Sequence, residues 1–251
     1  MDEALTLYEF RFSHYNEKAR WALDYKGIGH RRVALLPGPH MRFLKRHTGQ
    51  TQTPALRDGE RWICGSAAIV EWAEAQQPSR PLFPMDAGER AAALEWIRWL
   101  DKTVGWWVRV LGLGAMLQDA AYVTRVFAGD RSPLVQLLYR SAFPLARGMI
   151  ARGNGLNAQA SERAEQEVAQ ALERIGARLD AHPWLAGDHF TAADLTAASL
   201  LAPLCDPEWP TMHRPEPRPP QLQALLARYA REPVCDWVRE TYRTHRAAPG
   251  A

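Results

Sequence analysis

A serine and an asparagine lie near the start of the chain, where a short apolar segment gives way to a helical one. Residues 5–10, LTLYEF, are apolar-rich and partly alternating, as expected of a half-buried strand. Ala19 and Leu23 then recur at the spacing of an amphipathic helix. Ser13 and Asn16 therefore fall at its first turn. Because a helix start offers unpaired N–H groups and a partial positive charge, the pattern predicts a site for an anion such as a thiolate.

The residues of this first turn fit the pattern of a known superfamily. The segment SHYNEKAR, residues 13–20, resembles the S-P-Y-S-x-K-V-R stretch of the glutathione S-transferase superfamily, whose first domain is thioredoxin-like. The positions that match are Ser13, Tyr15, Lys18 and Arg20. The resemblance implies that glutathione is the thiol, as a co-substrate, and that no metal is required.

The resemblance gives the first turn its candidate catalytic residues. Ser13 takes the first position of the C-x-x-C box of the wider thioredoxin group and Asn16 the last, so either could contact the thiolate. A plain helix cap is the alternative for Ser13. His14 replaces the family's proline and is expected to be exposed. Some branches use a strand-end tyrosine, but Tyr8 is poorly placed for that role, and strand packing is its alternative. No cysteine lies at positions 13–16, which disfavours a thiol–disulfide oxidoreductase.

Residues 50–75 resemble the second half of the same domain. Thr53 and Pro54 match the family's V-P-x-L, in which the proline is cis and the backbone pairs with the glutathione cysteine. Gly65 and Ser66 stand where the family has Glu/Gln-Ser, the pair that holds the γ-glutamyl end of glutathione. The serine is retained, and we expect it to cap a helix. The preceding acid or amide is lost, which puts glutathione affinity in question.

A third match lies far downstream, in residues 182–204. Thr191 and Asp194 have the N-cap and N3 spacing of a capping box, and Phe190 and Leu195 that of a hydrophobic staple. The family has the same cap on a helix buried in its all-helical second domain. We therefore expect this cap to be structural.

The three matches together predict the fold class and the domain order. We expect an α/β thioredoxin-like, glutathione-binding domain at 1–78, a proline-containing linker at 79–88, and an all-α domain at 89–251 that carries the acceptor-substrate pocket. The first domain should run strand, helix, strand, hairpin pair, helix. Residues 206–220 form a proline-rich loop before the last helices.

The acceptor pocket is expected along the helix that follows the linker. Residues 91–110 are rich in leucine and tryptophan, as in a long and heavily buried helix. Trp106, Trp107 and Arg109 on this helix could line a pocket for a flat apolar electrophile, together with Tyr8. Packing in the helical core is the alternative for these aromatic residues.

Composition narrows the classes of partner. The formal net charge is +3 and no basic run alternates with aromatic residues, so we expect no nucleic-acid partner. No segment approaches the roughly 18 apolar residues of a spanning helix, and no secretory signal is evident, so we expect no membrane partner. Cys64, Cys205 and Cys235 are far apart and show no C-x-x-C spacing. We therefore expect neither a disulfide nor a zinc site, and a reducing cytoplasmic location.

Three functions are compatible with these matches. The first, which we favour, is a glutathione transferase that conjugates the thiolate to a small apolar electrophile, as a homodimer because family members usually are. The second is a glutathione-dependent isomerase or lyase. The serine-type branches that isomerise maleyl compounds carry Ser-Ser-Cys where this chain has residues 13–15, Ser-His-Tyr, which counts against it. The third is a binding protein that kept the fold and lost catalysis, for which Gly65 is the main argument.

Overall fold

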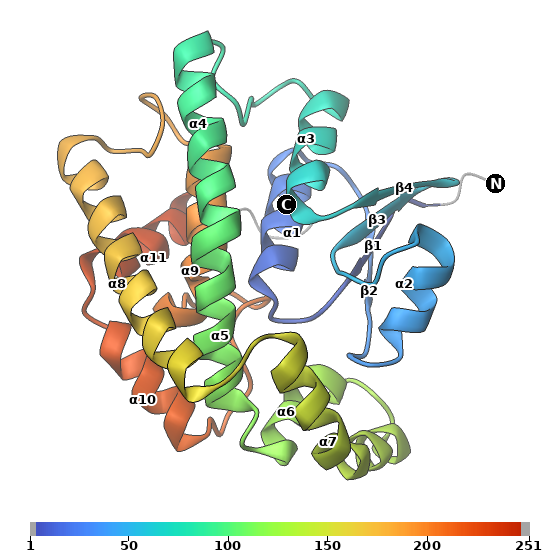
Figure 1. Ribbon diagram of the computed structural model, residues 1–251. Coiled ribbons are helices and arrows are strands. Elements are labelled where there is room, and N and C mark those ends of the chain that lie inside the picture. The colour runs from blue at the N-terminus through green and yellow to red at the C-terminus, as the bar shows by residue number, and fades with distance from the viewer. Residues whose placement is uncertain (1–3, 247–251) are drawn as a thin grey trace.

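A computed structural model describes residues 4–246, and its fold class is the predicted one: a sheet with helices, followed by a helical region (Figure 1). The four strands are β1 (Thr6–Glu9), β2 (Arg31–Ala34), β3 (Ala55–Asp58) and β4 (Arg61–Cys64). They lie in the order β2-β1-β3-β4, with β2 parallel to β1 and the two remaining pairings antiparallel. The predicted strand, helix, strand, hairpin pair and helix are all present, but the prediction missed one further helix, His40–Thr48, which lies between β2 and the hairpin.

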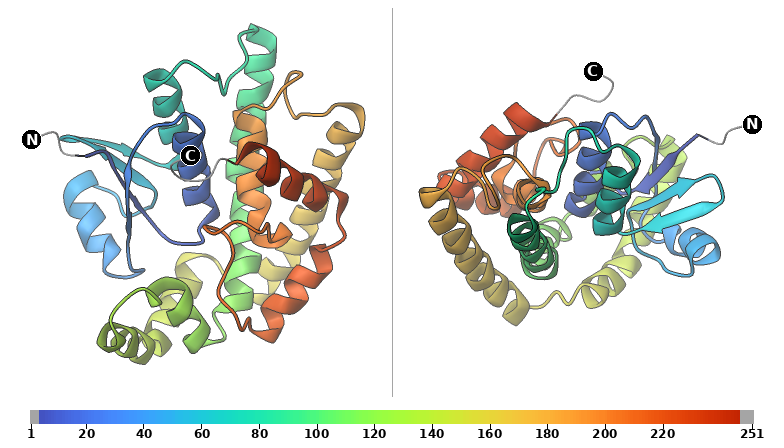
Figure 2. Two further views of the ribbon diagram at one scale, coloured as in Figure 1. Left: turned by 180° about the vertical axis from the view of Figure 1, so that it is seen from behind. Right: turned by 90° about the horizontal axis from the view of Figure 1, so that it is seen from above.

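The two faces of the sheet bury different residues because side chains alternate along each strand. Leu7 and Leu56 are paired across the sheet and belong to a buried cluster with helices α1 (His14–Tyr25) and α3 (Ser66–Gln76). Tyr8, the next residue of β1, lies against Phe43 of helix α2 (His40–Thr48) and against Trp62, with ring centroids 5.0 and 5.2 Å away. The views agree that α1 and α3 lie between the sheet and the helical region (Figure 2).

The helical region surrounds one completely buried helix. Its elements are α4 (Ala87–Trp99), a π-helical segment η1 (Leu100–Val104), α5 (Gly105–Met116), α6 (Ala120–Ala128), α7 (Pro133–Gly153), α8 (Ala158–Ala181), α9 (Ala192–Cys205), α10 (Pro220–Tyr229) and α11 (Pro233–His245). Every residue of α9 is buried, and α9 packs against both α1 and α11. The long helix expected at 91–110 is present but contains the π-helical segment. Residues 206–219 form the predicted irregular loop.

The start of α9 is fixed by the predicted capping box. The hydroxyl of Thr191 accepts from the Ala193 N–H at 3.2 Å, and Asp194 Oδ2 accepts from the Thr191 N–H at 2.9 Å. Asp194 Oδ1 accepts from the Leu185 N–H at 2.8 Å, so the same carboxylate also ties down the preceding loop. This cap satisfies N–H groups that would otherwise be buried without partners.

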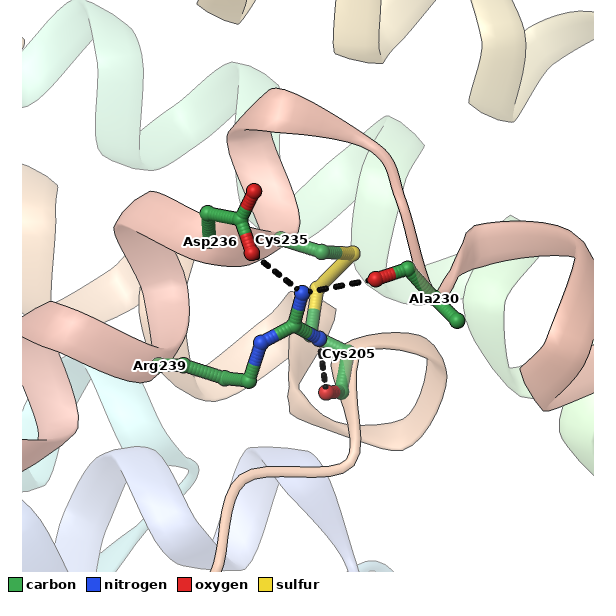
Figure 3. Close-up of a disulfide and its surroundings, with 5 residues drawn as sticks. All are labelled: Cys205, Ala230, Cys235, Asp236 and Arg239. Atoms are coloured by element: carbon green, nitrogen blue, oxygen red, sulfur yellow. Dashed lines mark hydrogen bonds and ion pairs between the residues drawn. A yellow bond between two sulfur atoms is a disulfide. The ribbon is translucent and has the colours of Figure 1, made fainter.

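The expectation of no disulfide is wrong, because Cys205 and Cys235 are joined (Figure 3). Cys205 ends α9 and Cys235 lies in the first turn of α11, with Cα atoms 4.8 Å apart. Arg239 braces the same junction by donating to the Cys205 carbonyl at 2.8 Å and to the Ala230 carbonyl at 2.9 Å. Spacing along the chain gave no sign of this pairing, because the irregular loop and helix α10 both lie between the two cysteines and together return the chain to the end of α9. Cys64 is a free thiol.

In residues 4–246 no helix is both long and apolar enough to span a bilayer.

Candidate functional site

The start of α1 is built so that the hydroxyl of Ser13 is not used by the helix. Ser13 occupies the N-cap position with extended backbone angles, yet its side chain forms no capping hydrogen bond. Its backbone carbonyl accepts from the Glu17 N–H at 2.8 Å, which starts the helix without the hydroxyl. Phe12, the residue before it, has φ = 57°, a left-handed conformation that a bulky side chain rarely adopts. Such local strain is characteristic of functional sites, where the surroundings hold it in place.

Asn16 joins the helix start to the loop before β3. Its side chain is completely buried, and Nδ2 donates to Thr53 Oγ1 at 3.2 Å. The Thr53–Pro54 peptide bond is cis, as the resemblance implied. Asn16 Oδ1 is buried and has no hydrogen-bond partner. An orphaned buried acceptor is costly, so this oxygen, which has no partner among the described residues, keeps Asn16 a candidate for contact with a ligand.

The third segment of the site is the start of α3. The Gly65 N–H donates to the Pro54 carbonyl at 2.9 Å, which brings the cis-proline loop against this helix start. Ser66 is buried and is the first residue of α3, not its cap, because Gly65 occupies the N-cap position. Gly65 has φ = 92° and ψ = 146°, a region open essentially to glycine alone. An acid or amide side chain at position 65 would therefore be strained in this backbone conformation.

His14 is buried, contrary to the expectation that it is exposed. Its Nε2 lies 2.9 Å from the Gly105 carbonyl, at the start of α5, and its ring lies 4.6 Å from that of Tyr15. Burial, aided by the positive charge of Arg109, lowers the pKa of His14 to about 3. The imidazole is therefore neutral at physiological pH and acts in packing α1 against α5, a contact across 91 residues that local sequence does not encode.

The π-helical segment η1 holds α1 by an ion pair and a hydrogen bond. Lys18 is fully buried, and its Nζ lies 2.7 Å from Asp101 Oδ2. The Tyr15 hydroxyl donates to the Asp101 backbone carbonyl at 2.7 Å. Gly105 permits this contact, since a Cβ there would lie 2.6 Å from Tyr15 Cζ. π-helical turns are frequent at functional sites, and this one shapes the surface next to Ser13.

The residues predicted to line the acceptor pocket do not all lie in one place. The Arg109 guanidinium lies over the rings of Tyr15 and Trp106, at 4.8 and 5.7 Å, and so faces the start of α1. Trp107 lies under Arg163 of α8 instead, at 5.6 Å. Tyr8 packs on the opposite face of the sheet from α1, against α2. The structure thus brings Trp106 and Arg109, but not Tyr8, toward the site.

The connection between α6 and α7 reaches the loop that precedes Ser13. Arg131 donates to the carbonyl of Ala34, and Asp130 pairs with Arg11 at 3.4 Å. Both are long-range contacts between the helical region and the ends of β1 and β2. The connection between α6 and α7 therefore lies beside the start of α1, which the sequence patterns did not predict.

A buried network of charged side chains lies next to the site. The sequence motif included one member of this network, Arg20, but did not predict the others. Arg20 Nε and Nη1 donate to Glu17 and Glu9, each at 2.8 Å. Glu17 also accepts from Arg246 Nε at 2.8 Å and from the Thr211 hydroxyl at 2.7 Å. The network joins β1, α1, the 206–219 loop and the end of α11. It fixes the position of the helix start from below.

The protein belongs to the thioredoxin-fold class. It combines a thioredoxin-like sheet, a polar helix start beside a cis-proline loop, and a helical region that follows. Residues 7–81 match the glutathione S-transferase N-terminal domain, and residues 158–228 match the C-terminal domain of the same proteins. The chain therefore belongs to the glutathione S-transferase superfamily.

Relatives and solved structures agree with this assignment. A maleylpyruvate isomerase from Ralstonia sp. is 29% identical over 133 residues, which span 52% of this chain and 59% of that protein. A theta class glutathione S-transferase from Xanthomonas axonopodis pv. citri, solved with glutathione bound, superposes with a TM-score of 0.59 at 22% identity, covering 99% and 100% of the two chains. The β-etherase LigF from Sphingobium sp. gives a TM-score of 0.60 at 21% identity, covering 95% and 100%. The last two show similarity of fold.

Proposed function

We propose that this protein is a glutathione transferase that conjugates the glutathione thiolate to a small electrophile with an apolar body. The observation that carries the proposal is the hydroxyl of Ser13, which lies at a helix start and is not used as a cap. In this reaction the sulfur forms a bond to the electrophilic carbon and a leaving group departs with its electron pair, or the sulfur adds to an activated double bond. The protein's task is to keep the sulfur ionised.

The energetics of this task match what the helix start offers. A free thiol has a pKa of about 8.5, and lowering it by two units needs about 2.7 kcal/mol of preference for the thiolate. A hydrogen bond from the Ser13 hydroxyl to the anion would supply about 1.5–3 kcal/mol. The helix start would add about 0.3–1 kcal/mol. These two sources are sufficient, with Asn16 as a second candidate contact to the cysteine of glutathione.

The remaining contacts to glutathione are proposed from the same three segments. The backbone at Thr53, before Pro54, would pair with the cysteine residue of glutathione. The γ-glutamyl carboxylate would lie at the start of α3, where the Ser66 hydroxyl and the unpaired N–H groups favour an anion. Because Gly65 supplies no acid or amide, we expect weaker binding of the γ-glutamyl amino group.

A glutathione-dependent isomerase is the second candidate, and the similarity to maleylpyruvate isomerase favours it. That reaction also needs a glutathione thiolate, which adds to the substrate and leaves unchanged. Ser13 and the helix start would serve both reactions, so product analysis decides between them: a stable glutathione adduct indicates transfer, and an isomerised substrate with glutathione regenerated indicates isomerisation.

Calorimetric titration with glutathione, followed by a conjugation assay with 1-chloro-2,4-dinitrobenzene, tests the proposal. We expect Ser66→Ala to weaken binding and Ser13→Ala to reduce conjugation by about 10–100-fold, the value of one hydrogen bond to an anion. Ser141→Ala, at an exposed position of α7, is the matched control and should change neither. An unchanged rate in Ser13→Ala would remove Ser13 from the mechanism. Failure of the wild type to bind glutathione would favour a binding protein that has lost catalysis.

We also propose a homodimer, which light scattering on the purified protein tests directly.

A further inference from the structure

Arg214, in the 206–219 loop, is a buried cation without a carboxylate partner. Five lysine or arginine side chains are classed as buried in residues 4–246: Lys18, Arg20, Lys26, Arg214 and Arg246. The other four each pair with an aspartate or glutamate. Arg214 donates only to the Pro203 carbonyl, at 3.3 Å. That carbonyl is at the end of α9 and lacks its usual helical partner, because residue 207 is proline. The backbone contact is explained. Asp206 acts on Arg214 electrostatically, but its carboxylate pairs with Arg218, so Arg214 has no ion-pair partner of its own in residues 4–246.

Arg109 is a second, partly buried cation that forms no ion pair with a described residue. Its guanidinium lies over two aromatic rings, and among the described residues no carboxylate lies within ion-pairing distance. Burial lowers the pKa of both Arg109 and Arg214, although an arginine stays charged at any physiological pH. Two desolvated positive charges that form no ion pair in residues 4–246 are costly, and an anion supplied from outside the chain would offset that cost.

A buried hydroxyl without a partner lies near the same arginine. Tyr122 of α6 is fully buried, and its hydroxyl has no hydrogen-bond partner. Burial raises the pKa of Tyr122, and the charge of Arg214 opposes that rise, so the two groups are close enough to interact. A phenol within electrostatic range of a guanidinium can donate to an anion that the guanidinium also binds.

These groups lie along α5, which packs against the start of α1 through His14. Gly105, Arg109 and Gly112 share one face of α5, since they are spaced four and three residues apart. A Cβ at Gly112 would lie 3.8 Å from Arg214 Nη2, so Arg214 packs on that face as well. His14, next to Ser13, is affected by the charges of both arginines. Asn16, in contrast, contacts the cis-proline loop.

We propose that the electrophile carries a carboxylate, which Arg109 and Arg214 bind with the Tyr122 hydroxyl as a further donor. This inference rests on the proposed function and names the substrate class: a small electrophile with an apolar body and one acidic group. The apolar body would lie against Tyr15 and Trp106, and the acid would set its orientation relative to the thiolate.

Calorimetry with a matched pair of unreactive probes, 3,5-dinitrobenzoate and 3,5-dinitrobenzamide, tests the proposal with and without glutathione. We expect the wild type to bind the acid about tenfold or more tightly than the amide, as one charge-assisted hydrogen bond provides. Arg109→Gln and Arg214→Gln should each abolish most of this preference. Arg218→Gln is the control from the same loop, because Arg218 already pairs with Asp206 and Glu216, and it should keep the preference.

Several results would overturn the proposal. These are failure of both probes to bind, equal affinities in the wild type, or a preference that survives in Arg109→Gln. Arg109 is partly exposed and forms no hydrogen bond to the described chain, so this variant decides the matter even where Arg214→Gln does not fold. If glutathione affinity falls in the two variants as much as probe affinity, the carboxylate bound is that of glutathione and the proposal is wrong. A retained acid preference without any conjugation would refute the transferase function and leave this inference standing.

Discussion

Replacing Glu17 with glutamine should destabilise the protein strongly, because the change removes a buried charge and turns one of its two acceptor oxygens into an NH2 donor that faces other donors. Glu17 is fully buried and accepts from Arg20, Arg246 and Thr211 at 2.7–2.8 Å. Burial alone would raise the pKa of Glu17, but the charges of Arg246 and Arg20 outweigh it and lower the pKa from 4.5 to about 2. A shift of this size corresponds to about 3 kcal/mol of folding free energy at neutral pH. Breaking a buried ion pair from one side costs about 3–5 kcal/mol, which agrees.

The pH dependence gives the same prediction a second test. Because the pKa of Glu17 is depressed in the folded state, its contribution is complete above the unfolded pKa of 4.5 and is lost as the pH falls toward 2. The free energy of unfolding of the wild type should therefore decrease over this range more steeply than that of Glu17→Gln. Urea unfolding at a series of pH values, followed by tryptophan fluorescence, measures both quantities.

A glutamate in an exposed pair supplies the control. Glu240 pairs with Arg243 at 2.6 Å, and the two side chains are 53% and 75% exposed. Glu240→Gln should leave the unfolding free energy unchanged within error, since exposed pairs contribute little. If Glu17→Gln is as stable as Glu240→Gln at pH 7, the buried network does not hold the helix start and the reasoning fails.

Two further changes test the junctions around the site. Cys205→Ser should lower the unfolding free energy by about 3–4 kcal/mol under non-reducing conditions, because the disulfide closes a loop across 30 residues. Cys64→Ser is the control, since Cys64 is a free thiol, and equal stability of the two variants would argue against the bond. Gly105→Ala should lower the free energy of unfolding by about 1–3 kcal/mol, because its Cβ would overlap Tyr15. Gly114→Ala, in the same helix with open space around it, should be neutral or stabilising. The opposite order of the two melting temperatures would contradict the packing described.

Local patterns in the sequence predicted the elements of the fold well. The alternation around Leu7 and the helical spacing of Ala19 and Leu23 are properties of short segments, and so is the cap at Thr191 and Asp194. Each of these features depends on neighbours within a few residues, so it can be predicted from a short stretch of sequence. The resemblance at residues 13–20 also located the helix start correctly.

The environment of the site could not be predicted in the same way. His14 is buried because α5 packs on it from far along the chain, and Cys205 meets Cys235 because the irregular loop at 206–219 and helix α10 return the chain to the end of α9. Arg214 lies in that proline-rich loop, whose path no periodicity describes. Long-range packing decides which polar groups lose their water, and that determines their chemistry.

The ion pairs of Arg246 have a consequence for how the protein is made. Arg246 is the last described residue, and it binds Glu17 and Asp24 in the first helix of the chain at 2.8 and 2.7 Å. The thioredoxin-like part emerges first from the ribosome, but this support for its helix start is synthesised 229 residues after Glu17. The amino-terminal part therefore cannot reach its final stability before Arg246 has been synthesised and has folded back onto α1. A chain truncated before residue 246 should be more open to chaperones and proteases.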